Sequence, residues 1–155
     1  MSLQLRPHQE HGLEKLRAGF ARGHHAQILY GPCAFGKTEL AISMMVGASD
    51  KGKRSAMVLD RRILCEQTSQ RLWKYGIDHG VIMQGSNRYR PDQKIQICTA
   101  QTLEKREGFP AVDLLVIDEA HCVRKETAAF IKNHPGLKVV GLSGSPFAKG
   151  LGSIY

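Results

Sequence analysis

Residues 31–38, with the sequence GPCAFGKT, have the types and the spacing that a polyphosphate-binding loop requires. The two glycines let the backbone bend around an anion, so that successive N–H groups point inward. The Lys37 ammonium can reach the β- and γ-phosphates, and the Thr38 hydroxyl can bind Mg²⁺. A tight strand-to-helix turn that carries a lysine and a threonine would not need both glycines. We therefore expect a nucleotide to contact the whole loop, namely Gly31, Pro32, Cys33, Ala34, Phe35, Gly36, Lys37 and Thr38.

The segments on either side of this loop agree with that chemistry. Residues 26–30 are predicted to form a short buried strand, and residues 39–46 an apolar helix. Strand, loop and helix in this order place the positive end of the helix dipole against the bound phosphates.

A second group of polar residues follows the apolar run LLVI at 114–117. We expect Asp118 to hold Mg²⁺ opposite Thr38, and Glu119 to orient or deprotonate an attacking water. The alternative is an acidic pair that only complements the dipole of a helix N-terminus. His121 either forms a hydrogen-bonded link between the nucleotide site and a neighbouring segment, or is a polar residue without that role.

The rest of the chain must bring these two groups together. Short apolar runs alternate with segments of helical periodicity, which predicts an α/β fold with a parallel sheet covered by helices on both faces. The expected strands are 26–30, 55–59, 80–83, 94–98, 113–117 and 137–142. The expected helices are 5–20, 39–46, 60–75 and 124–133, with a short one after the fourth strand.

The carboxyl ends of parallel strands lie along one edge of the sheet, where ligands bind. The segments GPCAFGKT, DRR, TAQT, DEAH and SGSP each follow an expected strand, so we expect them to meet at that edge.

Two local expectations can be checked against a structure. We expect a turn over residues 47–53 after the second helix. We also expect the third helix to end at Gly76 and to bury one face, which consists of Ile63, Leu64, Gln67, Leu72 and Trp73.

The composition limits the class of protein. A chain of 155 residues makes one ordinary domain, and no stretch approaches the ~18 apolar residues of a membrane span. With no signal-like N-terminal segment, a cytoplasmic location is expected. The cysteines (Cys33, Cys65, Cys98 and Cys122) form no close pair, which argues against a zinc site or a disulfide framework. The net charge of +8 suits a polyanionic partner, but also a well-solvated basic surface.

Taken together, GPCAFGKT, DEAH, TAQTL and SGSP resemble motifs I, II, Ib and III of a superfamily 2 helicase or translocase. LRPHQ resembles its adenine-reading Q-type motif, and VLDRRILCEQ resembles motif Ia. The resemblance implies ATP and Mg²⁺ as cofactors and covers one RecA-like P-loop NTPase domain, residues 1–155. Such motors have a second RecA-like domain, here in the same or a partner chain, which supplies an arginine to the ATP.

The resemblance also implies roles for individual residues. Gln9, with Arg6 nearby, would recognise adenine, although LRPHQ also suits a proline-led helix start. Arg61, Arg62, Gln101 and Thr102 would contact a nucleic-acid backbone, although paired arginines at a helix start are often only solvated. His121, Ser143 and Ser145 would couple the nucleotide state to the nucleic acid.

The function that these expectations favour is ATP hydrolysis coupled to movement on, or unwinding of, a nucleic acid. The motif set is closest to the restriction-subunit and excision-repair-type branch, which favours DNA over RNA. On its own, without the second domain, this chain is expected to be nearly inactive. Two alternatives stay open: a P-loop ATPase of another class, and a non-catalytic module in which ATP gates nucleic-acid binding.

Overall fold

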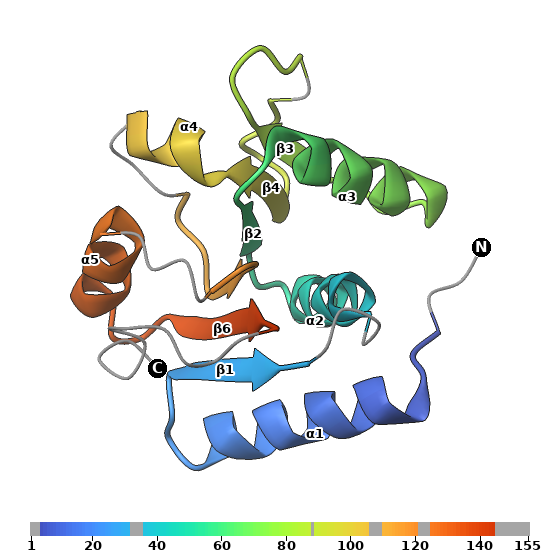
Figure 1. The fold of residues 1–155 in the computed structure, drawn as a ribbon, viewed down its shortest axis with the longest axis vertical. Helices are drawn as coiled ribbons and strands as arrows, with labels where there is room; N and C mark the ends of the chain where they lie inside the picture. The colour runs from blue at the N-terminus through green and yellow to red at the C-terminus, as the bar shows by residue number, and fades with distance from the viewer. Residues whose placement is uncertain (1–3, 32–35, 88, 106–109, 121–124, 145–155) are drawn as a thin grey trace.

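Strands and helices alternate along the chain (Figure 1). The computed structural model describes residues 4–31, 36–87, 89–105, 110–120 and 125–144. The helices are α1 (Pro7–Ala21), α2 (Lys37–Asp50), α3 (Arg62–Lys74), α4 (Ala100–Lys105) and α5 (Lys125–Asn133). The strands are β1 (Ala26–Tyr30), β2 (Ser55–Leu59), β3 (Gly80–Ile82), β4 (Ile95–Thr99), β5 (Leu114–Ile117) and β6 (Lys138–Ser143).

The strands form one 6-stranded sheet in the order β1-β6-β5-β2-β4-β3, and each described pair is parallel. The register aligns the carboxyl ends, because Tyr30 lies opposite Ser143 and Leu59 lies opposite Thr99. The predicted parallel α/β fold is therefore confirmed. The residues that follow β1, β6, β5, β2 and β4 all emerge along one edge, which we call the carboxyl edge.

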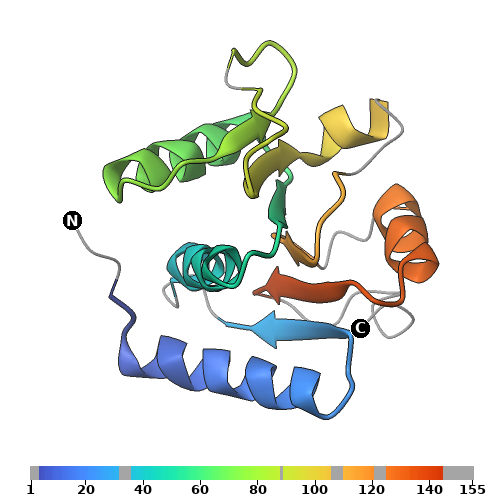
Figure 2. The ribbon, with the colours of Figure 1, turned by 180° about the vertical axis from the view of Figure 1, so that it is seen from behind.

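Helices cover both faces of the sheet (Figures 1 and 2). Successive strand residues point to opposite faces, so the buried apolar side chains divide into two clusters. One cluster joins α1, α2 and α3 to the sheet, and the other joins α4 and α5 to its opposite face. Cys65 belongs to the first cluster and Cys98 to the second, and burial raises the pKa of the Cys65 thiol to about 12.

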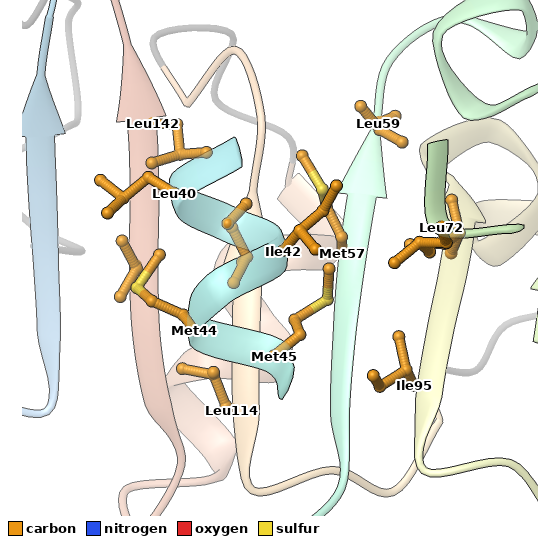
Figure 3. Close-up of a cluster of buried hydrophobic side chains, with 14 of the residues drawn as sticks. Leu40, Ile42, Met44, Met45, Met57, Leu59, Leu72, Ile95, Leu114 and Leu142 are labelled. Carbon is orange, nitrogen blue, oxygen red and sulfur yellow. The ribbon is translucent and has the colours of Figure 1, made fainter. Parts of the chain in front are cut away.

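Helix α2 lies across the middle of the sheet (Figure 3), and its first residues, Lys37 and Thr38, end the predicted phosphate-binding loop. Leu40, Ile42 and Met45 are fully buried, and burial of each such side chain contributes about 1.5–3 kcal/mol. The expected turn over 47–53 is wrong in part, because α2 continues to Asp50. Gly47 lowers helix propensity by only about 1 kcal/mol, which the packing of Met44 and Met45 offsets.

The predicted buried face of α3 is wrong in part, because Leu72 is buried and Leu64 half-buried as expected, but other members of the face are not. Ile63 is 60% exposed and Trp73 is 43% exposed. The residues that α3 buries are Cys65, Thr68, Ser69 and Leu72. Two of these are polar and have internal partners, since the Thr68 hydroxyl donates to the Leu64 carbonyl and Ser69 Oγ lies 2.6 Å from His79 Nε2. The helix does end as expected, with Gly76 at a φ of 72° just after it.

Helix α1 begins at Pro7, whose ring fixes a φ suited to a first helical turn. It runs back along β1, so its first turn lies at the carboxyl edge and its last turn at the opposite, amino edge (Figure 1). Leu13 and Leu16 are buried, as their spacing predicts. Within the described ranges, no helix is long and apolar enough to cross a membrane.

Candidate functional site

The two ends of the phosphate-binding loop meet beside the end of β6. The Gly31 N–H donates to the Ser143 carbonyl at 3.0 Å, and Lys37 Nζ donates to the Gly31 carbonyl at 3.0 Å. A Cβ on Gly144 would lie 3.7 Å from the Gly31 oxygen and 4.0 Å from Lys37 Nζ. The Lys37 ammonium is thus held at the carboxyl edge, where it is predicted to bind the phosphates of a nucleotide.

Gly36, the residue before α2, has a left-handed backbone conformation and contacts the Gln9 side chain. Its φ is 78°, a left-handed value that glycine tolerates best. Gln9 Nε2 donates to the Gly36 carbonyl at 3.0 Å, and Gln9 Oε1 accepts from the Arg6 N–H at 2.7 Å. A Cβ on Gly36 would overlap the Gln9 amide. Gln9 therefore joins α1 to the phosphate-binding loop, and its adenine contact stays a prediction.

Asp118 and Glu119 follow β5 at the same edge and are half-buried. The Asp118 N–H donates to the Val58 carbonyl at 2.9 Å, and the Ala120 N–H donates to the Leu142 carbonyl at 3.0 Å. Between these two bonds Glu119 has a φ of 52°, which is uncommon for a residue with a side chain. Strain of this kind costs about 1–3 kcal/mol and is concentrated at functional sites.

The residues that would hold Mg²⁺ and phosphate are chemically suited to both. Thr38 lies half-buried in the first turn of α2, and Asp118 offers a carboxylate at the end of β5. Hydroxyl and carboxylate oxygens are hard ligands of the kind that Mg²⁺ prefers. The N-cap of α2 is Gly36, which has no side chain to satisfy the first N–H groups of the helix, so an anion can do so.

The residues predicted to contact nucleic acid lie on the other half of the carboxyl edge, after β2 and β4. Arg61 is exposed just before α3. Arg62 Nη1 donates to the Gln84 carbonyl at 3.0 Å, and Arg62 Nε lies 3.5 Å from Glu66 Oε1. Gln101 Nε2 donates to the Asp60 carbonyl at 2.8 Å, which joins α4 to the segment that carries the arginines.

Thr102 differs from these residues because its side chain is buried, with 6% exposed. Its hydroxyl oxygen accepts from the Gln84 N–H at 3.1 Å and from the Thr99 hydroxyl at 2.7 Å. The Thr102 hydroxyl thus holds the segment after β3 against α4. Its predicted contact with nucleic acid has no support from this placement.

Sequence reasoning missed a link between α2 and α3. Arg71 Nη1 donates to Glu39 Oε1 at 2.6 Å, and the Tyr75 hydroxyl donates to Glu39 Oε2 at 2.7 Å. The hydrogen bond to Glu39, with a smaller effect of burial, raises the pKa of Tyr75 above its ordinary value. Glu39 comes directly after Thr38, and Arg71 and Tyr75 lie at the end of α3, so this link joins the first turn of α2 to the last turn of the helix that begins at Arg62.

The structure therefore brings together Gly31, Gly36, Lys37, Gln9, Arg6 and Ser143, with Asp118 and Glu119 on the adjoining strand ends. Ser143 itself is 1% exposed. Several predicted site residues lie outside the described residues, namely Pro32, Cys33, Ala34, Phe35, His121 and Ser145.

The sequence of the chain matches a known protein family. The family described as Type III restriction enzyme, res subunit, matches residues 2–148. No curated protein gives a significant match.

Solved structures with the same fold are longer than this chain. The Sulfolobus solfataricus SWI2/SNF2 ATPase core in complex with dsDNA matches with a TM-score of 0.72 and 20% identity, over 98% of this chain and 34% of that one. The UvsW helicase from bacteriophage T4 gives a TM-score of 0.75 and 19% identity, over 92% and 53%. A nuclease-deletion mutant of the Type ISP restriction-modification enzyme LlaGI, in complex with a DNA substrate mimic, gives 0.70 and 20%, over 92% and 18%.

Proposed function

Because the chain belongs to the family described as Type III restriction enzyme, res subunit, and has the RecA-like fold of an N-terminal superfamily 2 helicase domain, we propose that it is the ATP-binding domain of a cytoplasmic, nucleic-acid-dependent ATPase. The observation that carries this proposal is the arrangement of the carboxyl edge. Residues suited to phosphate and Mg²⁺ follow β1, β6 and β5, whereas exposed Arg61 and Gln101 follow β2 and β4.

The nucleotide is bound through its phosphates. Backbone N–H groups that follow Pro32, up to the first turn of α2, would donate to phosphate oxygens. When the nucleotide binds, Lys37 gives up its 3.0 Å hydrogen bond to the Gly31 carbonyl and binds the β- and γ-phosphates instead. The ammonium therefore has hydrogen-bond acceptors in both states. Thr38 and Asp118 would hold Mg²⁺, which would withdraw negative charge from the phosphates.

Hydrolysis needs a water that attacks the γ-phosphorus in line with the bond to the leaving oxygen. Glu119 orients this water and accepts its proton as the new P–O bond forms and the bond to ADP breaks. The bend at Glu119 supports this role because the backbone bonds of Asp118 to Val58 and of Ala120 to Leu142 fix the point from which the carboxylate projects.

Contacts on the other half of the edge would go to the nucleic-acid backbone. Arg61, Arg62 and Gln101 are exposed and can bind phosphates of any sequence, as a motor on a track requires. DNA is the favoured track, because two proteins with this fold have been solved with DNA or a DNA mimic. His121, Ser143 and Ser145 are proposed to couple the two halves, and a second RecA-like domain to complete the ATP site.

The test is the rate of phosphate release with and without single- and double-stranded DNA and RNA, on this chain and on a longer native form. We expect DNA to stimulate turnover in the longer form, and Lys37→Ala to abolish nucleotide binding in both. Turnover that ignores nucleic acid would favour a P-loop ATPase of another class. Phosphate release at background with the second domain present would favour a non-catalytic, ATP-gated module.

A further inference from the structure

A cavity lies at the end of α2 away from the phosphate-binding loop. Its volume is about 330 Å³, and it opens between α1, α2 and the first residues of β5 and β6. The α2 residues that line it run from Ser43 to Ala48, and at about 1.5 Å per residue they lie about 10–15 Å along the helix from Lys37. It lies at the amino edge of the sheet, opposite both halves of the carboxyl edge.

The inner wall of this cavity is apolar. It is formed by Leu13 and Leu16 of α1, Met44 of α2 and Leu114 of β5. Each of these side chains is buried, with between 4% and 9% of its surface exposed. Figure 3 shows Met44 and Leu114 at the same end of α2. An apolar group that entered the cavity would therefore be removed from water on several sides.

The rim of the cavity is basic. Arg17, Lys51, Lys53 and Lys138 line it and are exposed. Among the described residues, none of these four side chains forms an ion pair with a carboxylate. The one acidic group that lines the cavity, Asp113, accepts a hydrogen bond from the Arg54 N–H at 3.0 Å. The rim thus offers four positive charges with no carboxylate paired to them.

This combination selects one kind of occupant. A nucleic-acid backbone would use the cations but leave the apolar wall uncovered, and a neutral apolar ligand would desolvate the cations without compensation. A second copy of this chain, with a net charge of +8, would be repelled by the rim. We propose that the cavity is a docking site for an acidic segment of a partner protein, which inserts a large apolar side chain and pairs flanking carboxylates with the rim.

The test uses the synthetic peptide Glu-Glu-Asp-Phe-Leu-Asp-Glu-Glu, blocked at both ends, and NMR of ¹³C-methyl methionine in this chain. Met44 lines the cavity, whereas Met45 and Met57 are fully buried against the sheet and serve as internal references. We expect the peptide to shift the Met44 methyl signal in a saturable way and to leave the other two in place. Two control peptides, with Ala-Ala for Phe-Leu or with Lys for each acidic residue, should shift none of them.

Matched charge reversals separate docking from general attraction to a basic protein. Lys51→Glu and Lys53→Glu, each made singly, should weaken peptide binding severalfold. Lys94→Glu, on the opposite side of α2 beside Asp92, should leave it unchanged. The thermal unfolding of each variant confirms that the fold is kept.

Three results would overturn the proposal. The first is an unshifted Met44 signal at millimolar peptide. The second is an equal loss of binding in the Lys94→Glu variant. The third is a Met44 shift caused by duplex DNA or by anionic lipid vesicles but not by the peptide, which would assign the basic rim to a different class of ligand.

Discussion

Asp118 and Glu119 are neighbours in the chain, but the fold holds them in different ways. Asp118 continues the line of β5 and is bonded through its N–H to β2, whereas Glu119 occupies a left-handed bend. If Asp118 holds the metal and Glu119 serves the water, Asp118→Ala should weaken Mg²⁺-dependent nucleotide binding. Glu119→Gln should keep binding and slow hydrolysis about 10²–10⁴-fold in the two-domain form. Nucleotide titration and single-turnover hydrolysis measure the two effects, and equal losses of ATP affinity would contradict the assignment.

Two glycines in or beside α2 make a matched pair for stability. Gly36→Ala would force a side chain into a left-handed conformation and against the Gln9 amide, so it should lower the free energy of unfolding by about 1–3 kcal/mol. Gly47→Ala lies within the helix with no atom near its added Cβ, and should raise that free energy by about 0.5–1 kcal/mol. Urea unfolding distinguishes them, and a Gly36→Ala variant at least as stable as the wild type would mean that the left-handed position is not constrained.

The side chains that chemistry fixes at a set spacing could be predicted from the sequence. The placement of Lys37 and Thr38 after β1, and of Asp118 and Glu119 after β5, agrees with the sequence, whereas the roles of these residues stay predictions. Thr102 could not be placed in this way, because a threonine in a polar segment gives no sign of whether its hydroxyl faces solvent or holds the Gln84 N–H.

Between elements, the contact from Glu39 to Arg71 and Tyr75 is the feature most directly tied to coupling. It joins the residue after Thr38 to the last turn of α3, whose opposite end begins at Arg62, a predicted nucleic-acid contact. We expect Arg71→Ala to preserve ATP affinity and to reduce the stimulation of turnover by DNA in the two-domain form severalfold. Lys74→Ala, an exposed change one turn further along α3, is the control and should have no effect. Equal stimulation in the wild type and Arg71→Ala would remove the coupling role.

The same contact gives a pH dependence whose sign is defined. The Tyr75 pKa is raised, chiefly because the neutral hydroxyl donates to the Glu39 carboxylate. The stabilisation is therefore fully present below the ordinary tyrosine pKa of about 10 and is lost as the pH rises through the higher folded value. Ultraviolet titration of tyrosinate in the wild type and in Tyr75→Phe isolates this group, and a Tyr75 pKa at or below the ordinary value would contradict the contact.

The strands were easier to predict than the surfaces of the helices. Continuous apolar runs such as 55–59 identify strands buried on both faces, and β2 has the predicted bounds. The face of α3 was mispredicted in part because Thr68 and Ser69 are buried with hydrogen-bond partners, Leu64 of the same helix and His79 beyond it, while Ile63 and Trp73 are not covered. Contacts between elements, such as Arg71 with Glu39, have no periodic signature in one sequence.

Across the molecule, the net charge of +8 raises the question of whether nucleic-acid binding is local or general. Arg61→Glu should reduce the salt dependence of DNA affinity by about one unit of slope, because a phosphate contact is lost, and should spare ATP binding. Lys94→Glu changes the net charge equally at the amino end of β4 and should leave the slope almost unchanged. The measurement is DNA affinity over a series of salt concentrations. Equal changes of slope in the two variants would mean that the whole basic surface attracts DNA.

A second domain should have the largest effect on the rate of ATP hydrolysis. This chain spans 34%, 18% and 53% of the three solved proteins compared above. We propose that ATP lies between this domain and a second RecA-like domain, which supplies an arginine to the transferring phosphoryl group. Such an arginine is worth about 10³–10⁵ in rate. The chain alone should bind Mg-ATP weakly, hydrolyse it barely above background and unwind no duplex.

Steady-state phosphate release tests this proposal when the second domain of a longer native form is added in trans or joined in one chain. We expect addition to restore turnover that DNA stimulates, and replacement of the second domain's arginine by alanine to remove it again. Robust DNA-stimulated turnover by the 155-residue chain alone would contradict the two-domain site. In that case the arginine would have to come from a neighbouring copy of this chain, so the rate per molecule would rise with protein concentration.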